Sequence, residues 1–323
     1  MSYLEHTAEA LFQEGRLQSL AVRVGCGDRV MIDYYKGAAD AATLFDMASV
    51  TKILSVTQLA LIALERRLIT LDQPLSETLT VRHLLTHTMG VGHRNLCQPG
   101  VTYENVGDYI LSLPPEIPVG SDVLYSCPAF ILLGKLLEKV FGRRLDALFT
   151  EYVAAPLAMT RTGFLPAERQ NIVNANSSEE EKGLVNDYNC RFLGGVAGNA
   201  GIFSCVEDLE KFCKMLLRRG EPLYSEATFL QAAQNHTPGM SEARGLGYLY
   251  VDARYPQTGT LFPVGSIGQC GHTGQMLFTD YRTGLYGIIL TDATRYAPKQ
   301  YHLVKEMRQE LCNAISIDIA PEA

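Results

Sequence analysis

The chain has 323 residues, of which 47% are hydrophobic and 20% charged, and its formal net charge is −7. This composition is typical of a globular protein with a substantial apolar core, and the length allows two domains or one domain with an insertion. The acidic balance and the absence of a basic stripe in the sequence argue against nucleic acid as a partner, because phosphate binding needs clustered lysines and arginines.

The beginning of the sequence lacks the basic segment and apolar core of a signal peptide. We find no uncharged apolar run of about 18 residues, the length needed to span a membrane. The eight cysteines are scattered and none forms a C-x-x-C pair, which favours free thiols in a reducing compartment. We therefore expect a cytoplasmic protein without a membrane partner.

The chain opens with a predicted helix and two predicted strands. Residues 3–16 carry apolar side chains at helical spacing. Residues 19–25 and 29–34 alternate between apolar and polar residues, and the Cys-Gly-Asp link at 26–28 suits a hairpin turn.

The centre of the chain is predicted to be mainly helical. Its expected helices are 44–67, 80–88, 103–113, 128–141, 143–155 and 206–219. Segments 89–122 and 160–190 are expected to be mostly irregular. Strands return at 247–251, 275–279 and 285–291, before a last amphipathic helix at 301–315.

Strands at both ends of the chain therefore bracket a helical middle. This order predicts an α+β fold, with a mixed α/β domain whose antiparallel sheet is flanked by the terminal helices. We assign residues 1–72 and 195–323 to this sheet domain and residues 73–194 to an inserted, mainly helical domain. The active-site cleft is expected between the two.

Ser49 and Lys52 are the first candidate catalytic residues. They lie three positions apart at the start of the apolar segment 44–67, a spacing that places both on one face of a helix. A lysine kept neutral by desolvation could remove the serine proton. On spacing alone, the favoured interpretation is a helix cap at Ser49 and a lysine that extends to water.

Further candidates are individually ambiguous. Tyr125 precedes a strong helix and is either a packed aromatic or a phenol that moves protons near Lys52. The turn 271–274 either simply starts a strand or leads into an edge strand whose N–H groups complete an oxyanion hole with Ser49. The glycine-dense segment 194–201 lacks a phosphate-binding pattern, so close backbone packing or a loop beside the substrate is the better interpretation.

A metal site is not expected. His83 and His87 are four positions apart, but Leu84 stands where the H-E-x-x-H motif has glutamate. No third ligand is evident in the sequence, so both histidines are interpreted as structural. A G-x-S-x-G elbow is also missing, since the nearest match at Ser266 lacks the first glycine.

Taken in order, the motifs resemble those of a known superfamily. S-x-x-K at Ser49, Tyr125 about 75 residues later and His-Thr-Gly at 272–274 match the serine β-lactamases and penicillin-binding proteins. The surrounding stretches LFDMASVTK, TVRHLLTHTMGV, APLAMTRTGF and DYNCRFLGGVAGNAGIFS fit as well. The resemblance runs from about residue 17 to 315 and is closest to the class C-like branch, which includes esterases, D-aminopeptidases and carboxypeptidase-like proteins.

The resemblance implies a role for each matching residue. Ser49 would be the acylated nucleophile, Lys52 its activating partner and Tyr125 the proton shuttle. The backbone N–H groups of Ser49 and Gln275 would form the oxyanion hole. Cys127, His272, Thr273 and Gly274 would contact the substrate, and neither a cofactor nor a metal is implied.

Three departures from the family pattern affect the expected specificity. Cys127 replaces the usual asparagine or aspartate of the second motif, and His272 replaces the lysine of the third. The segment after Gly274 is shortened, so we expect Met276 or Phe278 to line an apolar pocket.

These observations predict a serine hydrolase that acts on a small ester, an amide or a D-amino-acid peptide through an acyl-enzyme, with weak β-lactamase activity at most. The alternative is a catalytically impaired, penicillin-binding-like protein that binds a peptide or a cell-wall fragment.

Overall fold

A six-stranded antiparallel sheet organises the computed structural model, which describes residues 1–167, 170–254, 256–296 and 300–320. The strands follow the order β2 (Arg29–Gly37), β1 (Ser19–Cys26), β9 (Leu285–Thr291), β8 (Met276–Asp280), β7 (Ile267–Cys270) and β6 (Leu249–Tyr250). The β1–β2 hairpin from the start of the chain thus pairs, through β1, with β9 from its end, as the predicted α+β architecture requires. The fold class predicted from the sequence is confirmed.

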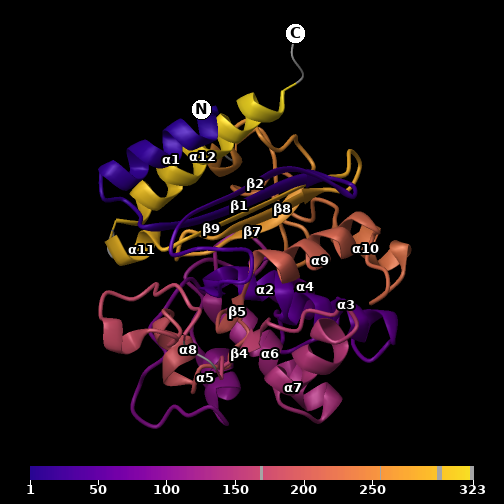
Figure 1. Cartoon of the computed structure of the whole chain (residues 1–323). Helices are drawn as coiled ribbons and strands as arrows, with labels where there is room; N and C mark the ends of the chain where they lie inside the picture. Colours follow the sequence, from indigo (N-terminus) through magenta and orange to yellow (C-terminus); the bar gives the residue numbers. More distant parts are fainter. Residues whose placement is uncertain (168–169, 255, 297–299, 321–323) are drawn as a thin grey trace.

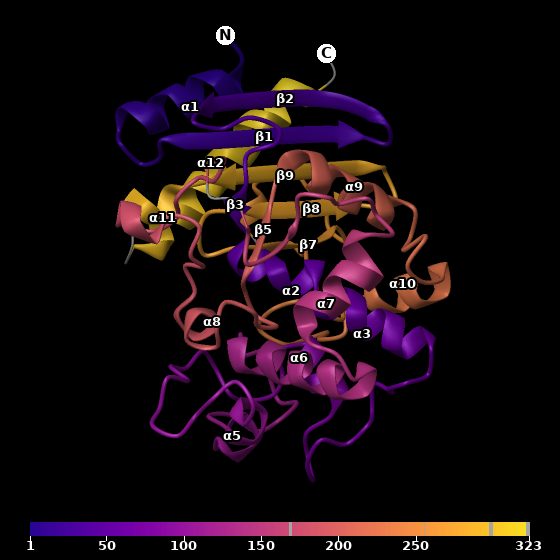
Figure 2. The same cartoon turned by 60° about the horizontal axis from the view of Figure 1, so that its bottom comes forward.

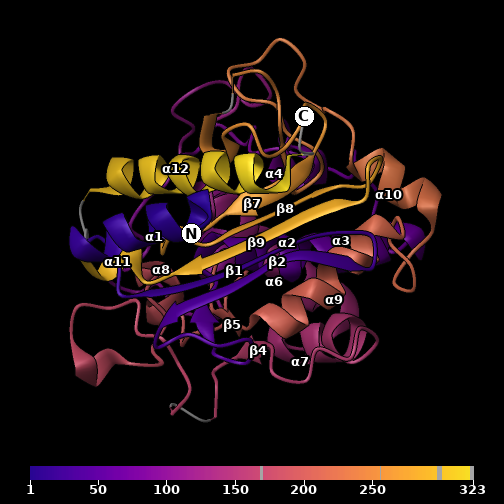
Figure 3. The ribbon, with the colours of Figure 1, turned by 45° about the horizontal axis from the view of Figure 1, so that its top comes forward.

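Two helices from opposite ends of the chain cover one face of the sheet (Figures 1 and 3). They are α1 (Tyr3–Gln13) and α12 (Tyr301–Ile319). The Asp318 carboxylate near the end of α12 accepts hydrogen bonds from the backbone N–H groups of Tyr3 and Leu4, each at 2.8 Å. The start of α1 is thereby fixed to the end of α12.

The opposite face of the sheet packs on the helical part of the molecule, best seen in Figure 2. The other α-helices are α2 (Thr51–Leu54), α3 (Val56–Glu65), α4 (Val81–Leu85), α5 (Val106–Ser112), α6 (Cys127–Phe141), α7 (Leu145–Phe149), α8 (Tyr188–Phe192), α9 (Val206–Leu217), α10 (Glu226–Ala232) and α11 (Ala293–Tyr296). Short 3₁₀ or π turns occupy Ala48–Val50, Thr150–Ala154, Glu179–Glu181 and Pro256–Thr258. The short strands β3 (Phe45–Asp46), β5 (Ile202–Ser204) and β4 (Gly163–Phe164) form a second sheet.

The helix predicted over 44–67 is interrupted in the structure. Ser55 leaves helical geometry, with φ −108° and ψ −89°, so that α2 and α3 are separate segments. The Ile53 carbonyl accepts a hydrogen bond from the Gln58 side chain at 2.7 Å, which supplies the partner that a continuous helix would provide through its backbone. Sequence periodicity could not reveal this break, because both segments keep an apolar pattern.

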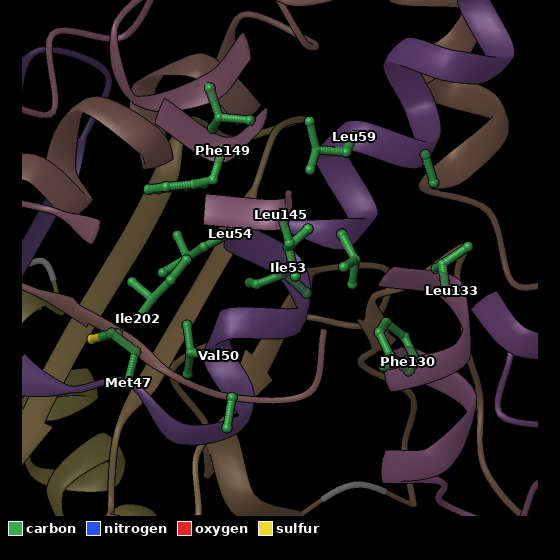
Figure 4. Close-up of a cluster of buried hydrophobic side chains, with 14 of the residues drawn as sticks. Met47, Val50, Ile53, Leu54, Leu59, Phe130, Leu133, Leu145, Phe149 and Ile202 are labelled. Atoms are coloured by element: carbon green, nitrogen blue, oxygen red, sulfur yellow. The ribbon is translucent and has the colours of Figure 1, made fainter. Parts of the chain in front are cut away.

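Within the described residues, Ala48–Glu65 has the length and composition of a membrane span, but 83% of it is buried inside the protein. It is therefore a core element of the fold. Figure 4 shows Ile53, Leu54 and Leu59 packed among side chains of α6, α7 and β5. Burial of each such side chain contributes about 1.5–3 kcal/mol to stability, so the segment that carries Ser49 is firmly held.

Several short elements escaped the sequence prediction, including β7, α10 and the second sheet. Strands of two to four residues are too short for a detectable alternation. One continuous apolar cluster includes Leu54, Phe130, Ile202 and Ile288, and so joins both predicted domains. The boundaries at residues 72 and 194 stay a prediction.

Candidate active site

Ser49 lies in the tight turn Ala48–Val50, which follows β3 after the single residue Met47. Ala48 has φ +43°, a left-handed conformation that is unfavourable for a residue with a side chain. The Asp46 carboxylate holds this turn, because it accepts hydrogen bonds from the N–H groups of Ala48 at 2.8 Å and Asn186 at 2.6 Å. The Asp46 carboxylate thereby links the strained turn at Ala48 to the segment at Asn186.

The Asp46 carbonyl connects this turn to the third motif. It accepts hydrogen bonds from the Thr273 hydroxyl and from the Gln275 side-chain amide, both at 2.9 Å. Gly271 allows the close approach, since a Cβ there would lie only 2.9 Å from the Met47 carbonyl oxygen. The segment before β8 and the serine turn are therefore one connected unit.

Two donors converge on the Ser49 hydroxyl oxygen. The Lys52 Nζ donates a hydrogen bond to Ser49 Oγ at 3.0 Å, and the Tyr125 hydroxyl donates another at 2.8 Å. Negative charge that develops on this oxygen would be stabilised by both groups. The structure thus brings together the three residues that the sequence singled out as catalytic candidates.

Lys52 has three acceptors for its three possible protons. Besides Ser49, it donates to the Asn199 carbonyl at 3.0 Å and to Cys127 Sγ at 3.6 Å. Desolvation opposes the charged form, but the nearby Cys127 and Tyr125 outweigh it, so the pKa of Lys52 is raised. These surroundings favour an ammonium ion in the resting site, where the sequence allowed a neutral lysine.

Aromatic and cationic groups surround Tyr125. The Lys52 ammonium and the Arg244 guanidinium lie 5.1 and 5.5 Å from the centre of its ring, and the His87 ring lies at 4.5 Å. Burial raises the pKa of Tyr125 in spite of the Lys52 charge. The resting phenol is therefore protonated and able to donate a hydrogen bond.

Cys127, the first residue of α6, takes the position beside Lys52. Desolvation opposes its ionisation, yet the Lys52 charge and a hydrogen bond with His93 lower the pKa of Cys127. The same hydrogen bond raises the pKa of His93. Cys127 is therefore a thiolate candidate between two basic side chains.

The glycine-dense segment 194–201 places the carbonyl that binds Lys52. A Cβ at Gly198 would lie 1.9 Å from the Phe130 carbonyl oxygen, so only glycine fits there. The adjacent Asn199 uses its side-chain amide to hold Asp187 at 3.0 Å. The packing interpretation of this segment agrees with the structure.

Of the third motif, His272 lines the cavity beside Ser49, whereas Thr273 and Gly274 are not among the lining residues. His272 also stacks on the Tyr301 ring at 5.0 Å. Burial lowers the pKa of His272, in spite of Asp187 nearby, so the imidazole is neutral. Thr273 is fully buried and bonded to Asp46, which makes it a positioning residue.

The backbone conformation and a close neighbour explain why a glycine occupies position 274. Its φ is +103°, and a Cβ there would lie 2.0 Å from the Thr291 hydroxyl oxygen. The following Gln275 turns its side chain inward, to Asp46 and Thr291, while its backbone continues toward β8. The Gln275 N–H remains the predicted oxyanion donor.

Met276 and Phe278 do not form an apolar pocket at the site. Both are fully buried in the cluster between the sheet and the terminal helices. Because side chains alternate along β8, these two residues share the face opposite to the active site. The sequence predicted the strand but not which of its faces pointed to the cleft.

A cavity of about 590 Å³ opens beside Ser49. Its lining includes Tyr125, Cys127, Asp187, Arg244 and His272, so residues from several distant segments meet there. Arg244 is buried and pairs with Glu242 at 2.6 Å, while its Nε and Nη1 atoms have no hydrogen-bond partner among the described residues.

Sequence reasoning missed Asp46, His93, Asn199 and Arg244. Asn199 acts through its backbone carbonyl, which carries no signal in the residue type. His93 and Arg244 lie in irregular segments where spacing predicts nothing. Asp46 is a buried acid three residues before Ser49, and a charge inside an apolar segment was the one signal that could have drawn attention.

The two histidines considered for metal binding have other contacts. His83 Nδ1 accepts a hydrogen bond from the Thr80 N–H at 3.1 Å and completes the cap of α4. The buried His87 accepts one from the Ser126 N–H at 3.0 Å through Nδ1. Each is accounted for by a structural role.

Comparison with known proteins agrees with the motifs. The model of the family described as Beta-lactamase matches residues 4–307. Esterase EstB of Burkholderia gladioli is 28% identical over 308 residues, which cover 77% of this chain and 77% of EstB. The D-alanyl-D-alanine-carboxypeptidase/endopeptidase AmpH of Escherichia coli is 24% identical over 258 residues, covering 69% of this chain and 64% of AmpH.

Solved structures share the fold. EstCE1, described as a hydrolase with promiscuous acyltransferase activity, superposes with a TM-score of 0.77 at 22% identity, covering 96% of this chain and 97% of EstCE1. The simvastatin synthase LovD of Aspergillus terreus reaches a TM-score of 0.76 at 17% identity, covering 99% and 98% of the two chains. With a family model that spans most of its length, the chain belongs to the β-lactamase family.

Proposed function

We propose that this chain, a serine hydrolase of the β-lactamase family, forms an acyl-enzyme on Ser49 with a small ester or amide. One observation carries the proposal: the Ser49 hydroxyl oxygen accepts hydrogen bonds from both Lys52 and Tyr125 beside a cavity of about 590 Å³. A serine becomes a nucleophile when adjacent groups take its proton and stabilise the charge on its oxygen.

The proton transfers follow from the contacts of Lys52. When its ammonium passes a proton to the Cys127 thiolate, the resulting amine can take the proton of Ser49. Ser49 Oγ then attacks the substrate carbonyl carbon, and the backbone N–H groups of Ser49 and Gln275 stabilise the oxyanion. Tyr125 donates its proton to the leaving group, and water later releases the acyl group from Ser49.

The site favours esters and simple amides over β-lactams. A neutral His272 stands where relatives with strong carboxylate recognition carry lysine, so the charge that would attract a penicillin carboxylate is missing at this position. The similarity to an esterase and to a D-alanyl-D-alanine carboxypeptidase supports these substrate classes. The binding-only alternative is less favoured, because Ser49 retains both of its hydrogen-bond partners.

The test combines turnover with active-site labelling. The protein should hydrolyse p-nitrophenyl acetate or butyrate, and a fluorophosphonate should add one adduct mass at Ser49. The Ser49→Ala variant should do neither. Equal turnover by the two proteins would disprove the proposal, and rapid nitrocefin hydrolysis would disprove the preference for esters.

A further inference from the structure

Cys127 differs in its surroundings from Cys190, Cys213 and Cys312, whereas Cys270 lines the same cavity. Burial raises the pKa of Cys190, Cys213 and Cys312, which lie within apolar clusters. Cys127 is also almost fully buried, with 4% of its surface exposed, but it lines the cavity beside Ser49. It is therefore reachable by a molecule that enters the substrate site.

The groups that face the Cys127 sulfur are mostly basic. The Lys52 Nζ from α2 lies 3.6 Å away, and His93 from the loop after α4 forms a hydrogen bond with the thiol. Asp187, at the start of α8, is an acidic group near the cluster and opposes the thiolate. The start of the 15-residue helix α6 adds its partial positive charge.

We propose that Cys127 is a second nucleophile of the cleft, a thiolate that reacts with α,β-unsaturated carbonyl compounds entering the Ser49 cavity, and that this modification inactivates the Ser49 centre. In the reaction, Sγ forms a bond with the β-carbon of the alkene. The electrons of the double bond move to the α-carbon, which takes a proton from water. The step needs no oxidant or reductant.

Two consequences of the adduct explain the inactivation, and this part rests on the proposed function. The added group occupies the cavity that receives the substrate of Ser49. The thioether also carries no negative charge, so it cannot accept the proton that Lys52 must release before it takes the proton of Ser49. One covalent modification therefore fills the substrate cavity and also removes the group that accepts the Lys52 proton.

The first experiment measures thiol reactivity and is independent of enzyme activity. Native protein is treated with N-ethylmaleimide at pH 6, and each cysteine is followed by peptide mass analysis. Cys127 should react at least about tenfold faster than the exposed Cys26, because thiolate is the reactive form. His93→Gln should slow the labelling of Cys127, and Ser49→Ala should leave it fast. Labelling of Cys127 no faster than that of Cys26 would overturn the proposal.

The second experiment tests the inactivation. Wild-type turnover of p-nitrophenyl acetate should fall in step with the fraction of Cys127 that is labelled. Cys127→Asn removes the thiol, so whatever turnover this variant retains should not decline on treatment. Full turnover in a fully labelled wild-type protein would refute the inactivation, whereas fast labelling of a protein without turnover would refute the proposed hydrolase alone.

Discussion

The Lys52 ammonium donates a hydrogen bond to the Asn199 carbonyl over 3.0 Å, although the residues are 147 positions apart in the chain. This bond fixes the direction of the amine toward Ser49. It also makes the orientation of Lys52 depend on a loop that contributes no side chain to the proposed chemistry. The packing of that loop is therefore as important to the site as the residues of the S-x-x-K motif.

Replacement of Gly198 by alanine should disrupt the site by displacing the loop that positions Lys52. The new Cβ would lie 1.9 Å from the Phe130 carbonyl oxygen, so the loop must move and take Asn199 with it. We expect a loss of at least about 2 kcal/mol in unfolding free energy, together with a large loss of ester turnover. Urea unfolding and kinetics measure both.

Gly163→Ala is the matched control for this substitution. A Cβ added at Gly163 would have no heavy atom within 4 Å, and the backbone there does not have a positive φ. This variant should be within about 0.5 kcal/mol of the wild type. Equal effects at the two positions would contradict the packing argument.

Lys52→Met should abolish most of the activity while keeping the volume of the side chain similar. The change removes one donor each from Ser49, from the Asn199 carbonyl and from Cys127, which keeps its hydrogen bond with His93. We expect kcat/KM for p-nitrophenyl acetate to fall at least about 100-fold, in the range typical of lost proton transfer. A loss of less than about threefold would show that the proton leaves Ser49 by another route.

The Tyr125→Phe variant should show whether the Tyr125 hydroxyl acts in the chemical step or in substrate binding. The variant keeps the ring that packs on His87 but loses the hydroxyl that donates to Ser49. We therefore expect kcat to fall about 100-fold, with little change in KM. A change confined to KM would instead assign Tyr125 to substrate binding.

The buried Asp46 should make stability depend on pH in an unusual direction. Desolvation raises the pKa of Asp46 from 3.8 to about 6, although the Asn186 and Ala48 N–H groups lower it. The folded protein thus holds a proton between these values that the unfolded chain has released. The contribution is fully present below pH 3.8 and is lost as the pH rises through 6.

This loss amounts to about 3 kcal/mol between about pH 4 and pH 7, at about 1.4 kcal/mol for each pH unit between the two pKa values. The check is urea unfolding of the wild type and of Asp46→Asn across this range. The unfolding free energy of the wild type minus that of the variant should decrease by this amount. A constant difference would mean that Asp46 is ionised throughout.

Sequence reasoning identified the three side chains that meet at the Ser49 hydroxyl, but not the groups that position them. Ser49, Lys52 and Tyr125 occur in short motifs that can be recognised in a single sequence by their residue types and spacing. The Asn199 carbonyl and the Asp46 carbonyl contribute through the backbone, which residue types do not describe. Their roles emerged only from the tertiary structure.

The sequence does not show which face of a buried strand points to the site, nor which groups surround a buried charge. The apolar alternation of β8 is visible in the sequence, yet Met276 and Phe278 were placed on the wrong face, since both faces of this strand are buried. For Lys52, the sequence allowed a neutral amine. Desolvation alone would favour a neutral amine, but the nearby Cys127 and Tyr125 reverse that effect.

The order of strands has a consequence for folding. Strand β1 pairs with β9, so residues 20–26 find their partners only at residues 285–291. Such distant pairing forms slowly, because a long loop must close first. During synthesis Ser49 leaves the ribosome long before Gln275, and a nascent chain lacking β8 and β9 has a nucleophile without its predicted oxyanion donor. Hydrolytic activity should therefore appear only when the last strands have joined the sheet.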